Sequence, residues 1–392
     1  MRSSARIPLI ASIVALTVIS APPTLALPSQ QPDSTWMVNG PVRTLERVGS
    51  TIWIGGSFTR LRSSATGGTT IRVRGLAAVD AETGRPVLGL HLPRIGGADP
   101  VVYDLDVGGG VLYAGGKFDS ADGKPRRNLI AIAPKTGRVL RFSSNAPTTY
   151  AVLADPDGGV YAGKPYVRRY RRSGARDAGF RTQTPTVSSG SANGPVILDL
   201  AFAPDGDVFV AGAFDFLNGE QHRIIAKLDP ATGEPGSWAL GGPLGTNPRG
   251  IDLFVDAGSD ALFAAVGGSD FAARYRLSDG GLVWKIDTSG ASQAIARFDA
   301  GQIVVGGHFK WVAPERGIKC GSNKHPTGDC DWRLRLAALD AATGDLDPTW
   351  DPAVRPDYFG VWSVLVRNGR LHVGGEFSEI EHVPQRYYGR LS

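Results

Sequence analysis

Residues 112–118 read Leu-Tyr-Ala-Gly-Gly-Lys-Phe: a short apolar run, a glycine pair and, one position later, an aromatic residue. Copies of this pattern, some of them weaker, recur along the 392-residue chain. Their anchoring glycines are at positions 56, 116, 163, 212, 268, 307 and 375, which are 39–68 residues apart. Repeats of this length predict a β-propeller in which each unit forms one blade.

Each unit also carries the signals of four short strands. An apolar strand and a Gly- or Asp-containing turn precede the glycine-pair strand, and a longer polar loop follows it. The third strand ends in an Asp-x-x-Thr-Gly turn at residues 80–84, 229–233 and 340–344. The Asp carboxylate can accept hydrogen bonds from nearby backbone N–H groups, and Gly tolerates a positive φ. We therefore expect an all-β fold, a seven-bladed β-propeller of four-stranded antiparallel blades.

The two ends of the chain predict how the ring closes. The last unit stops at Ser392, after its third strand, and residues 33–42 match the passage 347–354, which leads from a fourth strand into the next unit. The N-terminal strand is therefore expected to join the last blade as its outer strand. Such closure leaves no unpaired sheet edge to recruit another chain, so we expect a monomer.

The first 26 residues have the features of a signal peptide. Arg2 and Arg6 precede an apolar run over residues 7–19, and residues 24–26 fit a small-x-small cleavage site. The run is shorter than the roughly 18–20 residues that a membrane-spanning helix needs. We expect residues 1–26 to be removed and residues 27–392 to form a single secreted propeller domain with no transmembrane span. A retained N-terminal anchor is the alternative.

The chain has two cysteines, Cys320 and Cys330, with nine residues between them. In an oxidising extracellular compartment this spacing predicts one disulfide that closes a loop. A zinc site completed by His308 or His325 is the alternative, although the paired C-x-x-C spacing typical of structural zinc sites is absent.

Charge and motifs exclude several classes of function. Lys and Arg number 42 against 37 Asp and Glu, and no long uninterrupted basic run suggests nucleic-acid binding. The sequence contains no G-x-S-x-G elbow, H-E-x-x-H pair or P-loop. No cofactor is expected, with Ca²⁺ as the one exception considered below.

Three of these motifs together resemble the delta-60 repeat family, secreted bacterial propellers whose role is generally undefined. They are the Gly-Gly-x-Phe strand end, the Leu-Ala-x-Leu-Asp-x-x-Thr-Gly turn at residues 336–344 and the Trp-x-Pro exit at residues 350–352. The resemblance covers nearly the whole chain after residue 26 and implies a fold with almost no chemistry. Kelch repeats share the diglycine but not their spaced Tyr and Trp. Quinoprotein dehydrogenases carry an Ala-x-Asp-x-x-x-Gly-x-x-x-Trp docking turn. Residues 338–344 approximate its first part, but Trp350 lies two positions after the place of the Trp in that motif.

The longer loops should gather on one face of the ring, where variable loops on a rigid scaffold commonly bind ligands. Cations outnumber acids in these loops, and aromatic residues lie near them, which favours an anionic or sugar-containing ligand. A solvated basic surface is the alternative. The expected ligand-binding residues are Arg126, Arg127, His222, Arg223, Trp311, Lys324, His325, Trp332 and Arg386.

Three aspartates occupy equivalent positions in the first strand of their units: Asp104, Asp199 and Asp252. Carboxylates that face one channel repel each other unless they are protonated or share a cation such as Ca²⁺. Alternatively, each one accepts hydrogen bonds from backbone amides beside the channel. If the protein is an enzyme, a pair such as Asp104 and Asp199 could cleave a glycoside.

The sequence thus favours an extracellular, non-catalytic binding or structural propeller that recognises an envelope polymer, a glycan or a protein partner through its long-loop face. The alternative is a secreted carbohydrate-active hydrolase or lyase, or a quinoprotein-like enzyme, that uses the channel.

Overall fold

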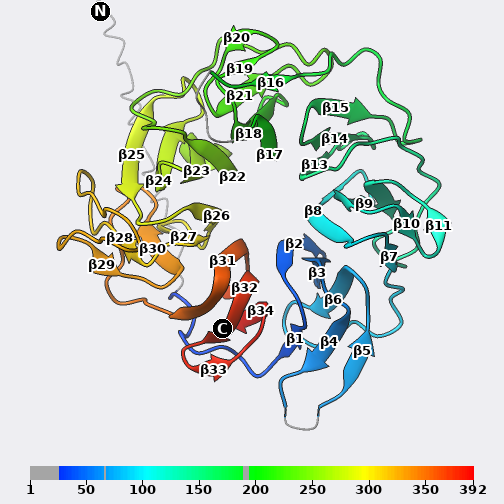
Figure 1. Ribbon diagram of the computed structural model, residues 1–392, viewed down its shortest axis with the longest axis horizontal. Helices are drawn as coiled ribbons and strands as arrows, with labels where there is room; N and C mark the ends of the chain where they lie inside the picture. Colours follow the sequence, from blue (N-terminus) through cyan, green and yellow to red (C-terminus); the bar gives the residue numbers. More distant parts are fainter. Residues whose placement is uncertain (1–25, 66–67, 189–193) are drawn as a thin grey trace, which may run out of the picture.

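The computed structural model describes residues 26–65, 68–188 and 194–392, so the expected signal peptide lies almost wholly outside the described residues. Within them the only helix is the 3₁₀ turn η1 (Ala257–Ser259), and the remaining regular elements are β-strands. Antiparallel sheets are arranged around a central space, and the first strand of each sheet is the innermost (Figure 1). No described helix is long and apolar enough to span a membrane.

The sheets follow one another in chain order, and each is built from strands that are consecutive or nearly so in the sequence. In order they are β2 (Val42–Val48), β3 (Thr51–Gly56) and β6 (Leu76–Asp80); β8 (Val101–Gly108), β9 (Val111–Lys117) and β12 (Leu129–Ile132); β13 (Ala151–Ala154), β14 (Val160–Gly163) and β15 (Val167–Tyr170); β17 (Val196–Phe202), β18 (Val208–Ala213) and β21 (Ile225–Leu228); β22 (Arg249–Asp256), β23 (Ala261–Gly267), β24 (Phe271–Arg276) and β25 (Leu282–Asp287); β26 (Ser292–Arg297), β27 (Gln302–Gly307) and β30 (Leu336–Asp340); and β31 (Val354–Arg367), β32 (Arg370–Ile380) and β34 (Tyr388–Leu391).

Among the described residues, the expected fourth strand is regular only in β22–β25, where β25 pairs with β24. In other sheets it is reduced to isolated antiparallel bridges, such as Val79 with Pro86, Ile132 with Val139 and Leu339 with Leu346. The Pro residues at some of these positions cannot donate to a ladder, which limits regular pairing there.

The glycine pair is explained by close packing on both sides of the second strand. A Cβ atom on Gly116 would overlap the carbonyl oxygen of Val101 in the neighbouring strand β8. A Cβ atom on Gly115 would lie 2.7 Å from Val152 of the next sheet. One glycine therefore lets the first strand approach, and the other lets the next sheet pack against it.

The connections between sheets form small outer sheets that the sequence did not indicate. Three of them combine a segment that precedes a first strand with a hairpin from the long loop of the same unit. The other two consist of a long-loop hairpin alone and of a short strand added to the last sheet. They lie farther from the centre than the first strands (Figure 1). They are β1 (Trp36–Val38) with β4 (Arg60–Ser63) and β5 (Thr70–Arg72); β7 (Ile95–Gly96) with β10 (Ser120–Ala121) and β11 (Lys124–Pro125); β16 (Pro185–Thr186) with β19 (Phe216–Leu217) and β20 (Glu220–Gln221); β28 (Trp311–Val312) with β29 (Asp331–Trp332); and β33 (Val383–Pro384), which pairs with the end of β32.

The first and last sheets are neighbours. The Leu45 amide donates to Ser363 Oγ at 3.2 Å, and Arg43 forms an ion pair with Glu376 at 2.6 Å. The N-terminal segment runs beside β34. The amide of Asp33 donates to the carbonyl of Arg390 in that strand, and the amide of Ser29 donates to the carbonyl of Ser392 just after it.

The segment expected to form the outer strand of the last blade is thus divided between two sheets. Its only regular strand, β1, pairs with β4 of the first unit instead, whereas residues 29–33 follow the last sheet. In the longest loop, Cys320 and Cys330 form the expected disulfide.

Candidate functional site

The first strands enclose a central cavity of about 820 Å³. A β-bulge in most of them, for example between Val102 and Asp104, adds one residue to the strand. Two successive side chains therefore face the cavity, and after the bulge the usual alternation resumes. The lining forms three levels, which we call the mouth, the middle and the floor. The mouth lies where the strand pairs with the second glycine, at the end from which the long loop leaves.

At the middle level, side-chain oxygens hold the backbone of the next sheet. Each accepts a hydrogen bond from a main-chain N–H of the following first strand, which we call a cross-sheet hydrogen bond. Asp104 accepts from Val152 at 2.7 Å, Asp199 from Leu253 at 2.7 Å, Asp252 from Ile295 at 2.7 Å and Ser363 from Leu45 at 3.2 Å. Ala151 and Ala294 occupy the same register position in their sheets and have no oxygen to offer.

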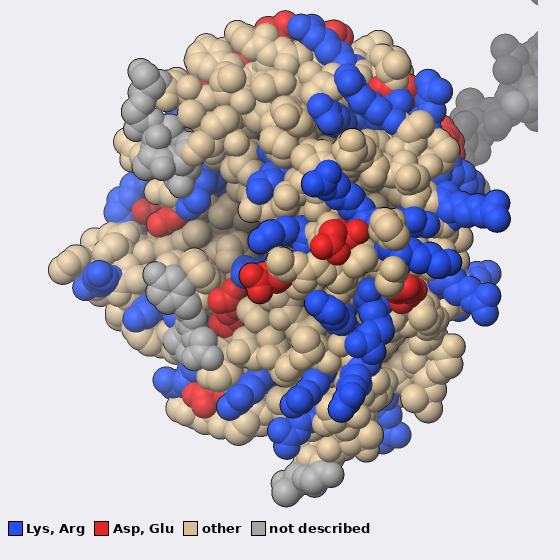
Figure 2. All heavy atoms as spheres, turned by 45° about the vertical axis from the view of Figure 1, so that its right-hand side comes forward, with Lys and Arg blue, Asp and Glu red and all other residues tan. Residues whose placement is uncertain are grey.

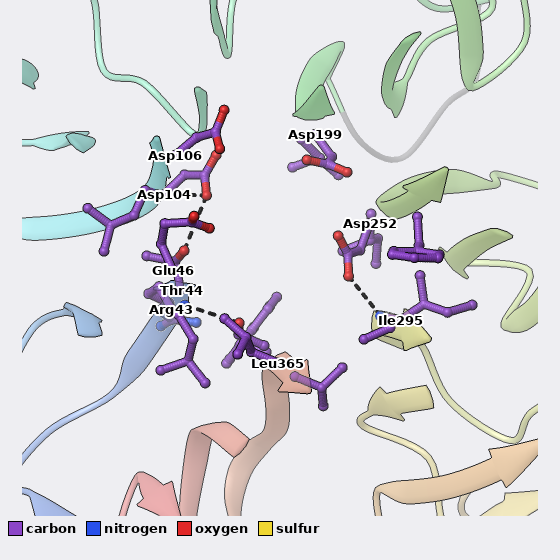
Figure 3. A pocket seen from close by; sticks show the side chains of 18 of the residues that line it. Arg43, Thr44, Glu46, Asp104, Asp106, Asp199, Asp252, Ile295 and Leu365 are labelled. Atoms are coloured by element: carbon purple, nitrogen blue, oxygen red, sulfur yellow. Dashed lines mark hydrogen bonds between the residues drawn. The ribbon is translucent and has the colours of Figure 1, made fainter. Parts of the chain in front are cut away.

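Asp104, Asp199 and Asp252 face the same open space from different sheets (Figure 3). Burial, followed by the charge of a neighbouring aspartate, holds the pKa values of Asp104 and Asp199 well above the ordinary range. Burial is also the main cause that raises the pKa of Asp252 to about 7. Their hydrogen bonds to backbone amides agree with the structural interpretation of these residues.

A metal site at these aspartates has no geometric support. Among residues 26–65, 68–188 and 194–392, no group of three or more His, Cys, Asp or Glu side chains is arranged to hold a metal ion. Calcium binding therefore stays a prediction based on the sequence alone, to be tested by titration.

Removing Asp104 should destabilise the fold. In Asp104→Ala, the amides of Leu105 and Val152 lose their acceptor, and each buried amide left without one costs about 1–3 kcal/mol. We expect the free energy of unfolding in urea to fall by about 2–5 kcal/mol. Asp104→Asn keeps one of the two acceptor oxygens and should therefore lose less stability than Asp104→Ala. Asp157→Ala, at an exposed turn, is the control. Stability equal to the parent in Asp104→Ala, with loss of a hydrolytic activity in Asp104→Asn, would instead favour the enzyme alternative.

The floor carries two more acids, Glu46 and Asp106, on the side of the cavity nearest Asp104 (Figure 3). Asp106 accepts hydrogen bonds from the amides of Val107 at 2.8 Å and Ala154 at 2.6 Å. Burial raises the pKa of Asp106 to about 6. Burial first, and the nearby Asp106 and Asp104 charges second, raise the pKa of Glu46 to about 9.

These raised pKa values make stability depend on pH. The fold favours the protonated form of Glu46, whose pKa is about 9 in the folded protein and about 4.3 in the unfolded chain. This contribution to the free energy of unfolding is fully present below about pH 4.3 and is lost as pH rises through about 9. We expect thermal unfolding to shift to lower temperature between pH 5 and pH 9, with a loss of at least about 2 kcal/mol. Glu46→Gln should flatten this dependence, whereas Glu315→Gln, on an exposed loop, should not. The same slope in the parent and in Glu46→Gln would contradict this assignment.

The mouth is largely aromatic. The rings of Tyr103 and Tyr150 meet edge to face with centroids 4.5 Å apart, and Lys164 lies 4.3 Å above the Tyr150 ring. Phe359 and Trp362 of the last sheet form a second pair, with centroids 5.8 Å apart. Arg43 lies over Trp362, and its charge is already paired with Glu376. The mouth thus offers flat rings, with one cation paired to Glu376 and another, Lys164, lying over a ring.

The residues expected to bind ligand lie in the outer sheets and loops, and none of them lines the central cavity. Only Trp311 and Trp332 form a close pair, with ring centroids 4.8 Å apart. Arg223 is 3.7 Å from Asp215, and His222 is buried 3.9 Å from Glu220. The exposed members are Arg127, Arg223, Lys324, His325, Trp332 and Arg386, and Arg126 and Trp311 are half-buried. The structure therefore distributes them over the rim of several sheets.

Sequence reasoning missed the aromatic residues of the mouth. Tyr103 and Trp362 each immediately precede the middle-level residue, Asp104 or Ser363. Their position one residue before an identified channel side chain was the available signal. Simple alternation would have pointed them away from the cavity, and only the bulge turns them inward.

Comparison with known proteins supports the fold. A family model described as a domain of unknown function (DUF5122) beta-propeller matches residues 203–234. No curated protein matches the chain. Among solved structures, the WD40 repeats of RRP9 are similar with a TM-score of 0.58 and 12% identity, over 94% of this chain and 99% of that one. The WD40 propeller domain of Doa1 gives a TM-score of 0.54 at 11% identity, over 94% and 97%.

A third similar structure is the extracellular domain of a putative one-component system from B. thetaiotaomicron, with a TM-score of 0.51 and 13% identity. The alignment covers 90% of this chain and 40% of that one. Identities this low carry information about architecture alone. Together with the sheets described above, they define the chain as an all-β protein with a β-propeller fold.

Proposed function

We propose that this chain is a secreted, non-catalytic binding protein of the delta-60 repeat type that holds a glycan at the mouth of its central channel. Residues 27–392 would form one monomeric, seven-bladed propeller, and the N-terminal segment would close the ring against the last sheet. The mouth belongs to the long-loop face, which the sequence indicated as the binding face. The site proposed on that face is central, inside the rim of loop residues.

The observation that carries this proposal is that the middle and the mouth of the cavity are lined by different kinds of side chain. The aspartates of the middle level are engaged with backbone amides of neighbouring strands. The mouth, in contrast, presents Tyr103, Tyr150, Phe359 and Trp362 at a cavity of about 820 Å³. Ligand sites are typically concave and lined by aromatic rings with a few polar groups, and a sugar ring can stack on such flat apolar faces.

The test is binding of soluble neutral oligosaccharides, measured by calorimetry and by thermal shift, since a ligand that binds only the folded state raises its melting temperature. We expect the double variant Tyr103→Ala with Phe359→Ala to weaken binding at least tenfold. Trp332→Ala, which removes an aromatic ring exposed at the rim, is the matched control and should bind like the parent.

Three results would count against the proposal. Equal loss in Trp332→Ala and in the mouth variant would move the site to the rim. Release of shorter sugars from the bound oligosaccharide would show turnover and would favour the enzyme alternative. If no oligosaccharide binds, and a purified protein binds the parent but not the mouth variant, the ligand of the mouth is a protein.

A further inference from the structure

A second, smaller cavity of about 340 Å³ lies at the outside of the β8–β9–β12 sheet, separate from the central channel. It is bounded by the β10–β11 hairpin on one side and by residues 138–141 on the other. The segment before β7 approaches it from the preceding unit, because the amide of His91 donates to the carbonyl of Thr136 at 3.2 Å. The cavity is therefore a built feature, assembled from two units of the repeat.

Its lining is strongly cationic. Four basic side chains contribute: Lys124, Arg126, Arg138 and Arg141. Within the described part of the chain, no ion pair is found for any of the four. Lys and Arg side chains also outnumber Asp and Glu on the side of the molecule turned forward in Figure 2, which includes the right-hand sheets of Figure 1.

The one carboxylate in the lining is already occupied. Asp122 lies 2.8 Å from His91 Nε2 and accepts a hydrogen bond from the amide of Arg94 at 3.0 Å. It therefore fixes the segment before β7 against the hairpin and forms no ion pair with any of the four basic groups. Three guanidinium groups converging on one cavity suit a tetrahedral oxyanion, because each planar fork can donate two parallel hydrogen bonds.

We propose that this cavity binds a phosphate or sulfate group. Such a group could be a free inorganic anion or an ester carried by a polymer. The site is distinct from the mouth of the channel and does not depend on the function proposed above. Val139 and Leu140 give the cavity an apolar wall, against which the carbon skeleton of an ester could pack.

The experiment measures binding of dextran sulfate to the full-length secreted protein, with neutral dextran as the reference and inorganic phosphate and sulfate as competitors. The double variant Arg138→Ala with Arg141→Ala should weaken binding of dextran sulfate at least tenfold. Arg72→Ala, at an exposed arginine of another outer hairpin, should change it less than twofold. Both arginines of the double variant are exposed, so its melting temperature should match that of the parent.

Binding of dextran sulfate no stronger than that of neutral dextran would overturn the proposal, as would an equal loss in Arg72→Ala, which indicates diffuse surface charge. If inorganic phosphate or sulfate displaces dextran sulfate from the parent, and the double variant no longer binds dextran sulfate, the site is supported and a free anion is sufficient to occupy it. If the inorganic anions do not displace dextran sulfate from the parent, and the double variant again fails to bind it, the site is supported and its ligand is an ester carried by a polymer. The mouth variant Tyr103→Ala with Phe359→Ala should bind dextran sulfate like the parent.

Discussion

A protein that lacks residues 27–40 should unfold at a much lower temperature than the parent, or aggregate. The deletion removes β1 and its pairing with β4, the backbone bonds to β34 and the buried side chain of Val38. It also leaves Trp350 without the carbonyl of Pro28, to which its indole donates at 2.9 Å. At about 1 kcal/mol for each hydrogen bond and 1.5–3 kcal/mol for a buried Val, the loss is at least about 5 kcal/mol. Typical domains have a total stability of only about 5–15 kcal/mol.

The measurement is thermal unfolding together with light scattering, because the exposed edge of β34 could pair with another chain. Asp33→Ala is the matched control, since it breaks the ion pair with Arg390 and keeps the backbone contacts. It should shift the midpoint by only a few degrees. If the truncated protein melts like the parent and stays monomeric, the N-terminal segment does not complete the last sheet.

The second large effect is expected for Gly116→Ala. The added methyl group would overlap the backbone carbonyl of Val101, and a backbone atom cannot be rotated away as a side chain can. Strand β8 would have to move, and with it Asp104 and its cross-sheet hydrogen bond to Val152. Forcing extra atoms into a packed core costs about 1–3 kcal/mol, and the displaced hydrogen bonds add to this, so we expect a loss above about 3 kcal/mol in urea unfolding.

Gly328→Ala is the matched control. Nothing lies within 4 Å of a Cβ atom built at Gly328, in the loop closed by the disulfide. The same glycine-to-alanine change should therefore be nearly neutral there. A loss of stability in Gly116→Ala no larger than that in Gly328→Ala would show that close approach of the strands does not explain the glycine pair.

The repeat was readable from the sequence because its cause is local. The glycine pair and the Asp-x-x-Thr-Gly turn are each short enough to be specified by adjacent residues, and in the structure Asp80 indeed accepts hydrogen bonds from the amides of Glu82 and Thr83. The equivalence of Asp104, Asp199 and Asp252 was also visible, because each immediately precedes a Leu in the first strand of its unit.

The sites were harder to predict because they depend on contacts between units. A bulge turns Tyr103 into the channel, whereas the simple alternation of side chains along a strand predicts the opposite orientation. The basic cavity joins His91 of one unit to Arg138 of the next, a contact between residues far apart in sequence. The expected ligand-binding residues were chosen because they lie in long loops. Loop length predicts the face on which a residue lies, but it does not predict which residues lie close together.

The two alanines at the middle level divide the molecule unequally. Hydrogen bonds between the first strands at the middle level run from β31 through β2 and β8 to β13, and again from β17 through β22 to β26. Between β2 and β8 the bond joins two side chains, because Thr44 Oγ1 donates to the Asp104 carboxylate. At Ala151 and Ala294 the series breaks. In repeat architectures, stability is approximately a sum of units and of the interfaces between them. The protein is therefore best regarded as two arcs joined at two seams. Partial opening, and the earliest hydrogen exchange of channel amides, should begin at those seams.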